Sequence, residues 1–371
     1  MHVYDIIQRL DELIALTDNI PQKHTNEETK TDERKTSFII PIAIERQPIR
    51  TFRAWKMKPF NFTLLGYSRA ADKTYFCIPQ LKLALDGGYC RGRLQNNLFL
   101  THGHFDHSAD IAYMTTHKKG MTIYCPKQIV NNISDYCKSF VELNCATTLP
   151  ETPKWDFIID GCDDKDHRYF GPKIKSKKCE TKNDSQIQKN DKYRAICFHC
   201  HHAVPCLGFM FEEKRRKKKE IYKELDFRTH KNKILELKRK GIDIMTDYYI
   251  KLFVYVGDTN INVFKTSPMI LTYPIIIIEC TFLYEKDRSL EQLKRDGHIN
   301  WTQLKPFVLK YCDIITFVII HFSCRYKEHQ IIEFFEKEDR DIQKQTNGEK
   351  SLGNCVIWAC KQDDGTQKVN L

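Results

Sequence analysis

Leu100–Ser108 reads LTHGHFDHS and directly continues an apolar run, NLFL, that is typical of a buried β-strand. It places four potential metal ligands in six positions: His102, His104, Asp106 and His107. Buried imidazoles and carboxylates need polar partners or a cation, so packing alone does not explain this cluster. Because alternate residues of a strand share a face, we expect His102 and His104 to point at one ion, with the next two ligands aimed at a second. The alternative is a His-rich surface turn.

The bulk composition describes a soluble globular protein. Of its 371 residues, 29% are charged and 41% are hydrophobic, which allows a large core. No apolar run approaches the roughly 18 residues of a membrane-spanning helix, and the first residues resemble neither a signal peptide nor a transit peptide. We therefore expect no membrane partner and a cytoplasmic or nuclear location. The net charge of +11 favours an anionic partner such as nucleic acid.

The 15 cysteines follow no regular spacing, which is typical of reduced thiols, and we expect no structural disulfides. Within CFHCHH, Cys197 and Cys200 form a CxxC that could make a separate zinc knuckle with His199 and His201. No second CxxC follows at a suitable spacing, so the sequence favours no additional structural zinc.

Residues 1–36 are expected to lie outside the main domain. Apolar side chains recur at helical spacing over 3–19, whereas 21–36 are polar and charged, as in a flexible linker. The helix could dock on its own domain or on a partner. Residues 37–371 are expected to form the main domain.

Short β-rich runs begin near Ser37, and the Gly and Pro residues between them predict one antiparallel sheet that includes NLFLTH. After the LTHGHFDHS loop, predicted strands and amphipathic helices alternate. Residues 160–192 are polar and basic and predict either a solvated insertion or a loop facing RNA. Residues 212–250 carry EKRRKKKE and ELKRKGIDI and predict two basic helices, which are either simply solvated or contact phosphates.

The second half repeats the pattern of a strand that ends in a potential ligand. RAICFHCHHAVPCLGFMF places His202 between two β-like stretches, and KLFVYVGDTN reaches Asp258. IIIIECTF ends its apolar run at Glu279, DIITFVIIHFSCRY reaches His321, and His298 directly precedes a predicted helix. Open layered α/β proteins keep their sites at the carboxyl ends of strands, so we expect these side chains to meet.

The combined nitrogen and oxygen donors suit two zinc ions per subunit. A carboxylate can bridge two ions, and Asp258 is the expected bridge. Two ions about 3.5 to 4 Å apart can activate a water for attack on a phosphoryl group. The predicted metal ligands are His102, His104, Asp106, His107, His202, Asp258 and His321.

Several motifs together resemble one known family. HGHFDH resembles the HxHxDH signature of the metallo-β-lactamase superfamily. HAVPCLGF, VGDTN, ECTF, GHINW and HFSCRY follow in the order found in the RNase Z (tRNase Z) family, the tRNA 3′-processing endoribonucleases. The resemblance runs from about residue 74 to about residue 340. It implies an αββα metallo-β-lactamase-like sandwich, here with a short N-terminal helical extension, and it is strongest for the short form of the enzyme.

The resemblance also implies how the two zinc ions are held. His102, His104 and His202 match the positions that hold one ion. Asp106, His107 and His321 match the positions that hold the second ion, and Asp258 matches the bridging position.

Catalytic and substrate-binding roles follow from the same matches. Asp106 occupies the position of the base that deprotonates the attacking water, and His298, supported by Glu279, resembles the donor of a proton to the leaving 3′ oxygen. Ser323 and Arg325 match positions near the scissile nucleotide. Arg325 could grip a phosphate through a bidentate pair, or it could cap the helix that follows the last strand.

The resemblance implies a homodimeric endonuclease that removes the 3′ trailer of precursor tRNA. Residues 212–250 lack a Gly-Pro tip and look similar to the reduced arm of plant-type short enzymes. The same ligands would also suit a glyoxalase II type thioesterase or a phosphodiesterase. The basic charge and the HFSCRY motif argue against both of these alternatives. A non-catalytic RNA-binding protein is the remaining alternative.

Overall fold

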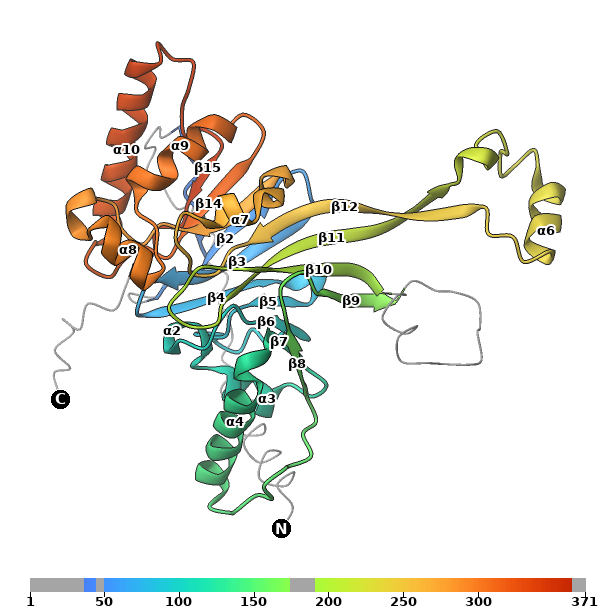
Figure 1. Cartoon of the computed structure of the whole chain (residues 1–371), viewed down its shortest axis with the longest axis horizontal. Coiled ribbons are helices and arrows are strands. Elements are labelled where there is room, and N and C mark those ends of the chain that lie inside the picture. The colour runs from blue at the N-terminus through green and yellow to red at the C-terminus, as the bar shows by residue number, and fades with distance from the viewer. Residues whose placement is uncertain (1–36, 45–49, 174–190, 362–371) are drawn as a thin grey trace, which may run out of the picture.

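The computed structural model describes residues 37–44, 50–173 and 191–361, and its strands form two sheets of eight and seven strands. The sheets pack face to face, with helices on both outer sides (Figure 1). The predicted αββα architecture is therefore confirmed. The helix and linker predicted within 1–36 lie outside the described residues. No helix in the described ranges is long and apolar enough to span a membrane.

The eight-stranded sheet follows the order of the chain. Strands β1 to β5 pair antiparallel, but β6 joins β5 in parallel, and the parallel pairing continues to β8. The prediction that NLFLTH continues an antiparallel sheet is therefore wrong, because a crossover places β6 parallel to β5. The strands are β1 (Ile42–Ala43), β2 (Arg53–Met57), β3 (Phe62–Arg69), β4 (Lys73–Ile78), β5 (Leu83–Leu85), β6 (Asn97–Phe99), β7 (Thr122–Pro126) and β8 (Ile158–Cys162).

The seven-stranded sheet is antiparallel from β9 to β12 and parallel from β12 to β15. Its strands are β9 (His167–Lys173), β10 (Asp191–His199), β11 (Leu207–Lys218), β12 (Met245–Tyr255), β13 (Ile275–Glu279), β14 (Thr316–Ile320) and β15 (Cys355–Ile357). Strands β8 and β9 thus occupy the start of the insertion predicted at 160–192. Residues 174–190 of that predicted insertion lie outside the described residues.

The helices cover the outer faces of both sheets (Figure 1). Beside the first sheet lie α2 (Phe105–Ser108), α3 (Ile111–His117) and α4 (Val130–Cys145). The second sheet carries α7 (Val263–Thr266), α8 (Leu290–Asp296), α9 (Trp301–Tyr311) and α10 (Glu328–Gln345), and α6 (Lys231–Arg239) lies apart. Short 3₁₀ turns are η1 (Pro79–Leu81), η2 (Lys127–Ile129), η3 (Glu220–Tyr222), η4 (Pro268–Thr272) and η5 (Glu285–Asp287).

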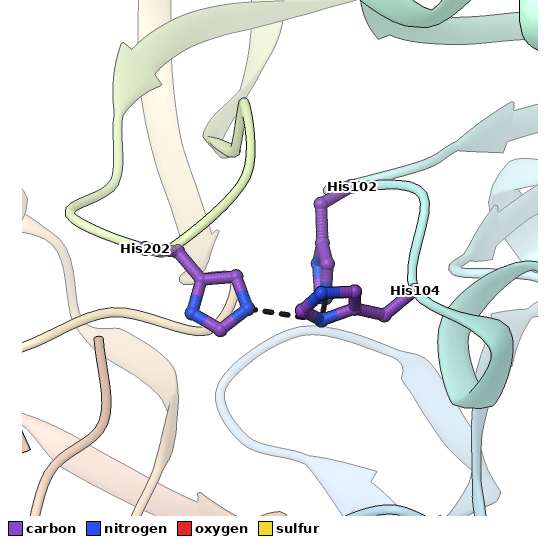
Figure 2. A group of neighbouring side chains, drawn as sticks. All are labelled: His102, His104 and His202. Carbon is purple, nitrogen blue, oxygen red and sulfur yellow. Dashed lines mark hydrogen bonds between the residues drawn. The ribbon is translucent and has the colours of Figure 1, made fainter. Parts of the chain in front are cut away.

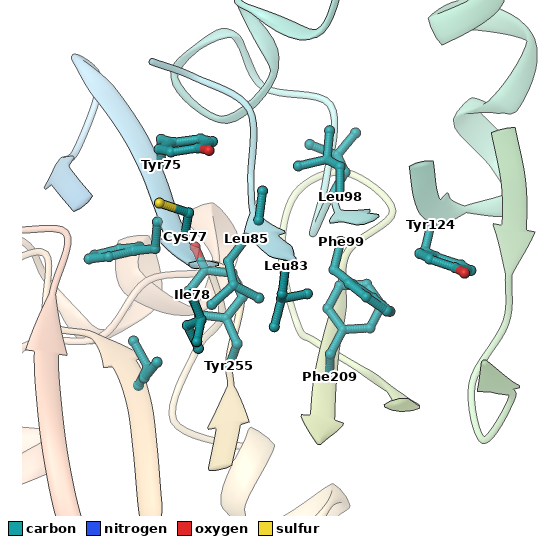
Figure 3. Close-up of a cluster of buried hydrophobic side chains, with 14 of the residues drawn as sticks. Tyr75, Cys77, Ile78, Leu83, Leu85, Leu98, Phe99, Tyr124, Phe209 and Tyr255 are labelled. Carbon is teal, nitrogen blue, oxygen red and sulfur yellow. The ribbon is translucent and has the colours of Figure 1, made fainter. Parts of the chain in front are cut away.

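The main core fills the space between the sheets, and Phe99 at the end of β6 lies within it (Figure 3). Its ring stacks on Tyr124 at 4.4 Å and meets Phe209 and Phe211 of the opposite sheet edge to face at 5.1 and 5.0 Å. Aromatic pairs of this kind add to the gain from burying apolar surface. The core therefore fixes the strand end from which the LTHGHFDHS loop begins.

The ends of β11 and β12 leave the sheet as a two-stranded ribbon that carries α6 at its tip, here called the arm (Figure 1). The helix predicted for the first basic run is wrong, because β11 continues as a strand to Lys218. Ion pairs across the ribbon support the strand, such as the one between Lys214 and Asp247 at 2.7 Å. The second predicted helix is present as α6, which packs Ile234 into a small apolar cluster at the tip.

The root of the arm is built around Glu212, which is 5% exposed and lies at an irregularity in the pairing of β11 with β12. Its carboxylate accepts hydrogen bonds from Arg194 Nε at 2.6 Å and from the Tyr273 hydroxyl at 2.7 Å. The Arg194 guanidinium in turn lies 3.4 Å from the ring centroid of Tyr249. Side chains from three strands and from Tyr273, which directly follows η4, thereby fix the point where the arm leaves the sheet.

Candidate metal centre

All seven predicted metal ligands converge where the ends of several strands meet. Loops after β6, β10, β12 and β14 supply His102, His202, Asp258 and His321 in turn. Strand β6 ends at Phe99, so a loop, rather than strand alternation, brings His104 beside His102. The structure thus confirms that these candidate residues follow the carboxyl ends of strands and lie close together.

The first ligand set consists of His102, His104 and His202 (Figure 2). His102 Nε2 and His202 Nε2 lie 3.2 and 3.1 Å from His104 Nδ1. Nitrogen ligands of a tetrahedral zinc ion, at bond lengths of about 2.0 Å, are about 3.3 Å apart. These separations match those of three ligands on one zinc ion.

The second ligand set consists of Asp106, His107 and His321. The Nε2 atoms of the two imidazoles are 3.1 Å apart, and Asp106 Oδ2 lies 3.4 Å from His321 Nε2 and 3.5 Å from His107 Nε2. Asp258 faces both sets, with its carboxylate 3.6 Å from His107 Nε2 and 3.9 Å from His102 Nε2. Its position is that of a bridging carboxylate.

Hydrogen bonds behind the rings of the first set fix which nitrogen faces the centre. Thr101 donates its hydroxyl proton to Asp86 at 2.9 Å, so its oxygen accepts from His102 Nδ1 at 2.9 Å. His202 Nδ1 donates to the carbonyl of Gly297 at 3.1 Å. In the neutral rings, His102 and His202 therefore direct Nε2 lone pairs at His104, as metal-binding imidazoles do.

The second set is oriented in the same way. His107 Nδ1 donates to Asp86 Oδ2 at 2.7 Å. The Thr281 hydroxyl donates to Glu279, so its oxygen accepts from His321 Nδ1 at 3.1 Å. If the His107 and His321 rings are both neutral, the lone pairs of their Nε2 atoms face each other at a separation of 3.1 Å. Such an arrangement requires a positive charge between the two nitrogens.

The electrostatics of the pocket favour a cation. Burial lowers the pKa of His107, but the carboxylates of Asp258, Asp106 and Asp86 outweigh burial and raise it to about 10. Burial raises the pKa of Asp106, yet the neighbouring His107 and His321 hold that pKa well below its usual range. The Asp106 carboxylate therefore remains charged and draws positive charge into the centre. The donor set therefore fits two borderline divalent cations, such as zinc, held by the two ligand sets.

Asp86 is a central residue that the sequence reasoning missed. It is fully buried, follows β5 and accepts hydrogen bonds from the Thr101 amide at 2.8 Å and the Tyr255 hydroxyl at 2.6 Å, in addition to those from the Thr101 hydroxyl and His107. It thereby orients one imidazole of each ligand set. The signal was present in ALDGG, where an acidic residue ends an apolar strand as the ligands do.

Replacing Asp86 with asparagine is expected to weaken zinc binding about 10- to 100-fold, because it disturbs the hydrogen bonds that orient His102 and His107. Chelator competition on the folded protein measures this affinity. Glu212→Gln is the matched control, since Glu212 is also a buried hydrogen-bond acceptor but lies at the arm root. Equal zinc affinity in wild type and Asp86→Asn would contradict the role given to Asp86.

His298 and Glu279 form a hydrogen-bonded pair beside the first ligand set. His298 Nδ1 donates to Glu279 Oε1 at 2.9 Å, and the buried carboxylate also accepts from the Thr259 amide at 2.9 Å. Burial lowers the pKa of His298, but Glu279 and then Asp258 raise it to about 9. The His298 side chain is 20% exposed, so a protonated imidazole is accessible at the edge of the centre.

The predicted substrate-binding residues lie farther along the same loop. Arg325 pairs with Asp287 at 3.3 Å and lies over the ring of Phe282, so it does not cap α10. The Ser323 hydroxyl accepts from the Arg325 amide at 3.4 Å. Neither Ser323 nor Arg325 belongs to a ligand group in the described residues, nor does Cys197 or Cys200. The described cysteines are free thiols.

The fold and the two ligand sets define an αββα protein with a candidate binuclear metal centre. No protein-family model matches the chain, and no curated protein matches it. Among solved structures, the chain is similar to the metallo-β-lactamase fold protein YhfI from Bacillus subtilis. The TM-score is 0.42 and the sequence identity 11%, over 81% of this chain and 88% of that one. At that distance the likeness assigns no function, and the functional argument depends on the geometry of the centre.

Proposed function

We propose that the protein is a zinc-dependent endoribonuclease of the RNase Z type that removes the 3′ trailer of precursor tRNA. The observation that carries the proposal is the pair of ligand sets facing Asp258, with the His298–Glu279 pair beside them. The motif HFSCRY, the basic charge and the arm support RNA as the substrate over a small ester.

The proposed reaction is a hydrolysis of the phosphodiester that follows the discriminator nucleotide. Two bound zinc ions would supply positive charge that lowers the pKa of a water and neutralises phosphoryl oxygens. Asp106 accepts the proton of the attacking water, and His298 donates a proton to the departing 3′ oxygen. Glu279 holds the His298 ring in position through Nδ1. The products are a tRNA with a 3′ hydroxyl and a trailer with a 5′ phosphate.

The arm supports a tRNA substrate because it presents positive charge far from the centre. At the end of α6, Lys238 and Arg239 and the following Lys240 are exposed at the tip. Lysine and arginine side chains bind nucleic acids by neutralising phosphates and releasing counterions. In the proposed enzyme the arm contacts the tRNA body, and in a homodimer the arm of one subunit would hold the tRNA that the other cleaves.

Cleavage of an end-labelled precursor tRNA tests the proposal. We expect one cut after the discriminator, with a 3′ hydroxyl and a 5′ phosphate, that disappears with a chelator and returns with zinc. A folded protein with two bound metal ions that leaves the RNA intact and hydrolyses thioesters or small phosphodiesters would instead be a small-ester hydrolase. RNA binding by a protein that takes up no metal would identify a non-catalytic RNA-binding protein.

A further inference from the structure

An apolar pocket of about 500 Å³ opens beside the first ligand set. His104 forms part of its wall, and the same ring directs Nδ1 at His102 and His202. The pocket is therefore directly adjacent to the candidate metal centre. A group attached to a phosphate in the centre can therefore reach this pocket.

The lining of the pocket excludes a charged occupant. Among the described residues that line it there is no lysine, arginine, aspartate or glutamate, so a phosphate would find no counterion there. Apolar residues form most of the wall, while the Asn132 amide and the hydroxyl oxygens of Ser108 and Tyr136 offer hydrogen-bonding groups. A flat, uncharged heteroaromatic ring with polar edges matches such a lining.

Phe105 provides an aromatic face at the mouth of the pocket. It lies between the ligands His104 and Asp106 as the first residue of α2, and its side chain is 69% exposed. The ammonium of Lys73 lies 3.9 Å from the centroid of the ring and holds it from one side. An exposed aromatic ring fixed beside a nuclease centre offers a nucleobase a surface for stacking.

We propose that the pocket receives the nucleobase next to the scissile phosphate, stacked on Phe105. This assignment rests on the proposed endonuclease function and adds a base-binding subsite to it. Stacking is available to every base, so the subsite fixes the position of the scissile phosphate without imposing a strict sequence. Ser108 and Asn132 can contact the polar edge of the base.

A cycle that combines protein and RNA changes tests the subsite. Synthetic precursor tRNAs carry a single abasic ribose on one or the other side of the cut, and kcat/KM is measured for wild type and Phe105→Ala. One abasic position is expected to lower kcat/KM for wild type about 10-fold. Phe105→Ala should show a similar loss on intact RNA and no further loss on that abasic RNA, with its zinc content unchanged.

Two further variants control the cycle. Asn132→Trp fills the pocket from an exposed position of α4 and should also lose the difference between intact and abasic RNA. Leu143→Ala, an 83% exposed apolar residue of the same helix outside the pocket, should respond to both RNAs as wild type does.

Several results would overturn the subsite. The first is equal cleavage of intact and abasic RNA by wild type. The second is that the loss caused by Phe105→Ala and the loss caused by the abasic ribose multiply when the two changes are combined. The third is an Asn132→Trp variant that dissociates a dimer and still discriminates abasic RNA. The last result would identify the pocket as a contact between copies of the chain. Failure to cleave any RNA would instead refute the proposed function.

Discussion

Asp106→Ala is expected to lower cleavage of precursor tRNA about 1000-fold or more, because in the proposed enzyme it removes both a metal ligand and the acceptor of the water proton. Asp106 Oδ2 lies 3.4 Å from His321 Nε2 and accepts a hydrogen bond from the Ala71 amide at 2.9 Å, which holds the carboxylate beside the second ligand set. Single-turnover cleavage of end-labelled RNA measures the rate, and metal analysis measures the zinc that remains bound.

Asparagine variants separate charge from packing at this position. Asp106→Asn keeps the size of the side chain and an acceptor for the Ala71 amide but removes the negative charge, and we expect nearly the same loss as with alanine. Asp110→Asn is the matched control, since Asp110 accepts the Cys90 amide at 2.9 Å and belongs to neither ligand set. Activity of Asp106→Ala within tenfold of wild type would show that Asp106 is not the base.

His298→Ala is expected to slow cleavage by about 100- to 10,000-fold, the usual contribution of a positioned general acid. The loss should depend on the leaving group. With a 3′ sulfur in place of the 3′ oxygen at the scissile bond, the leaving thiolate needs no proton, so His298→Ala should approach the wild-type rate. Asp106→Ala should stay slow on both substrates.

The matched control for His298 is His201→Ala, because His201 Nε2 contacts Thr266 and the ring lies outside both ligand sets. We expect His201→Ala to cleave both substrates as wild type does. An equal loss by His298→Ala on the oxygen and sulfur substrates would contradict the acid role and assign His298 to the structure of the centre instead.

Candidate ligands such as Asp258 and His321 were predictable because each is a polar residue at the end of a strongly apolar stretch. A buried strand such as the one ending at Glu279 has no packing reason to finish with a carboxylate, so the sequence alone marks the edge of the sheet. Asp86 obeys the same rule but was missed, since the Gly-Gly that follows reads as an ordinary turn. Its importance appears only when Thr101, His107 and Tyr255 are brought to it from separate elements.

The sequence predicted an arm at 212–250 but not its two-stranded ribbon, because β11 pairs with β12, which lies distant in sequence. Lysine and arginine favour helices by local propensity, and the first basic run was predicted as a helix on that basis. In the structure Arg216 pairs with Asp247, and Lys217 lies 5.6 Å from the ring centroid of Tyr248, on the neighbouring strand. Strand propensity depends on such cross-strand neighbours, which a local reading of the sequence does not contain.

The root of the arm fixes the distance and the direction between the arm tip and the metal centre. Glu212, Arg194 and Tyr273 set the direction in which the ribbon leaves the sheet. The seven residues from Glu212 to Lys218 span about 23 Å at 3.3 Å per residue, so a tilt of about 10° at the root displaces the tip by about 4 Å. For a tRNA held at the tip, that displacement approaches the spacing of neighbouring nucleotides. In the proposed enzyme, the geometry of the root would therefore influence which phosphodiester lies over the metal centre.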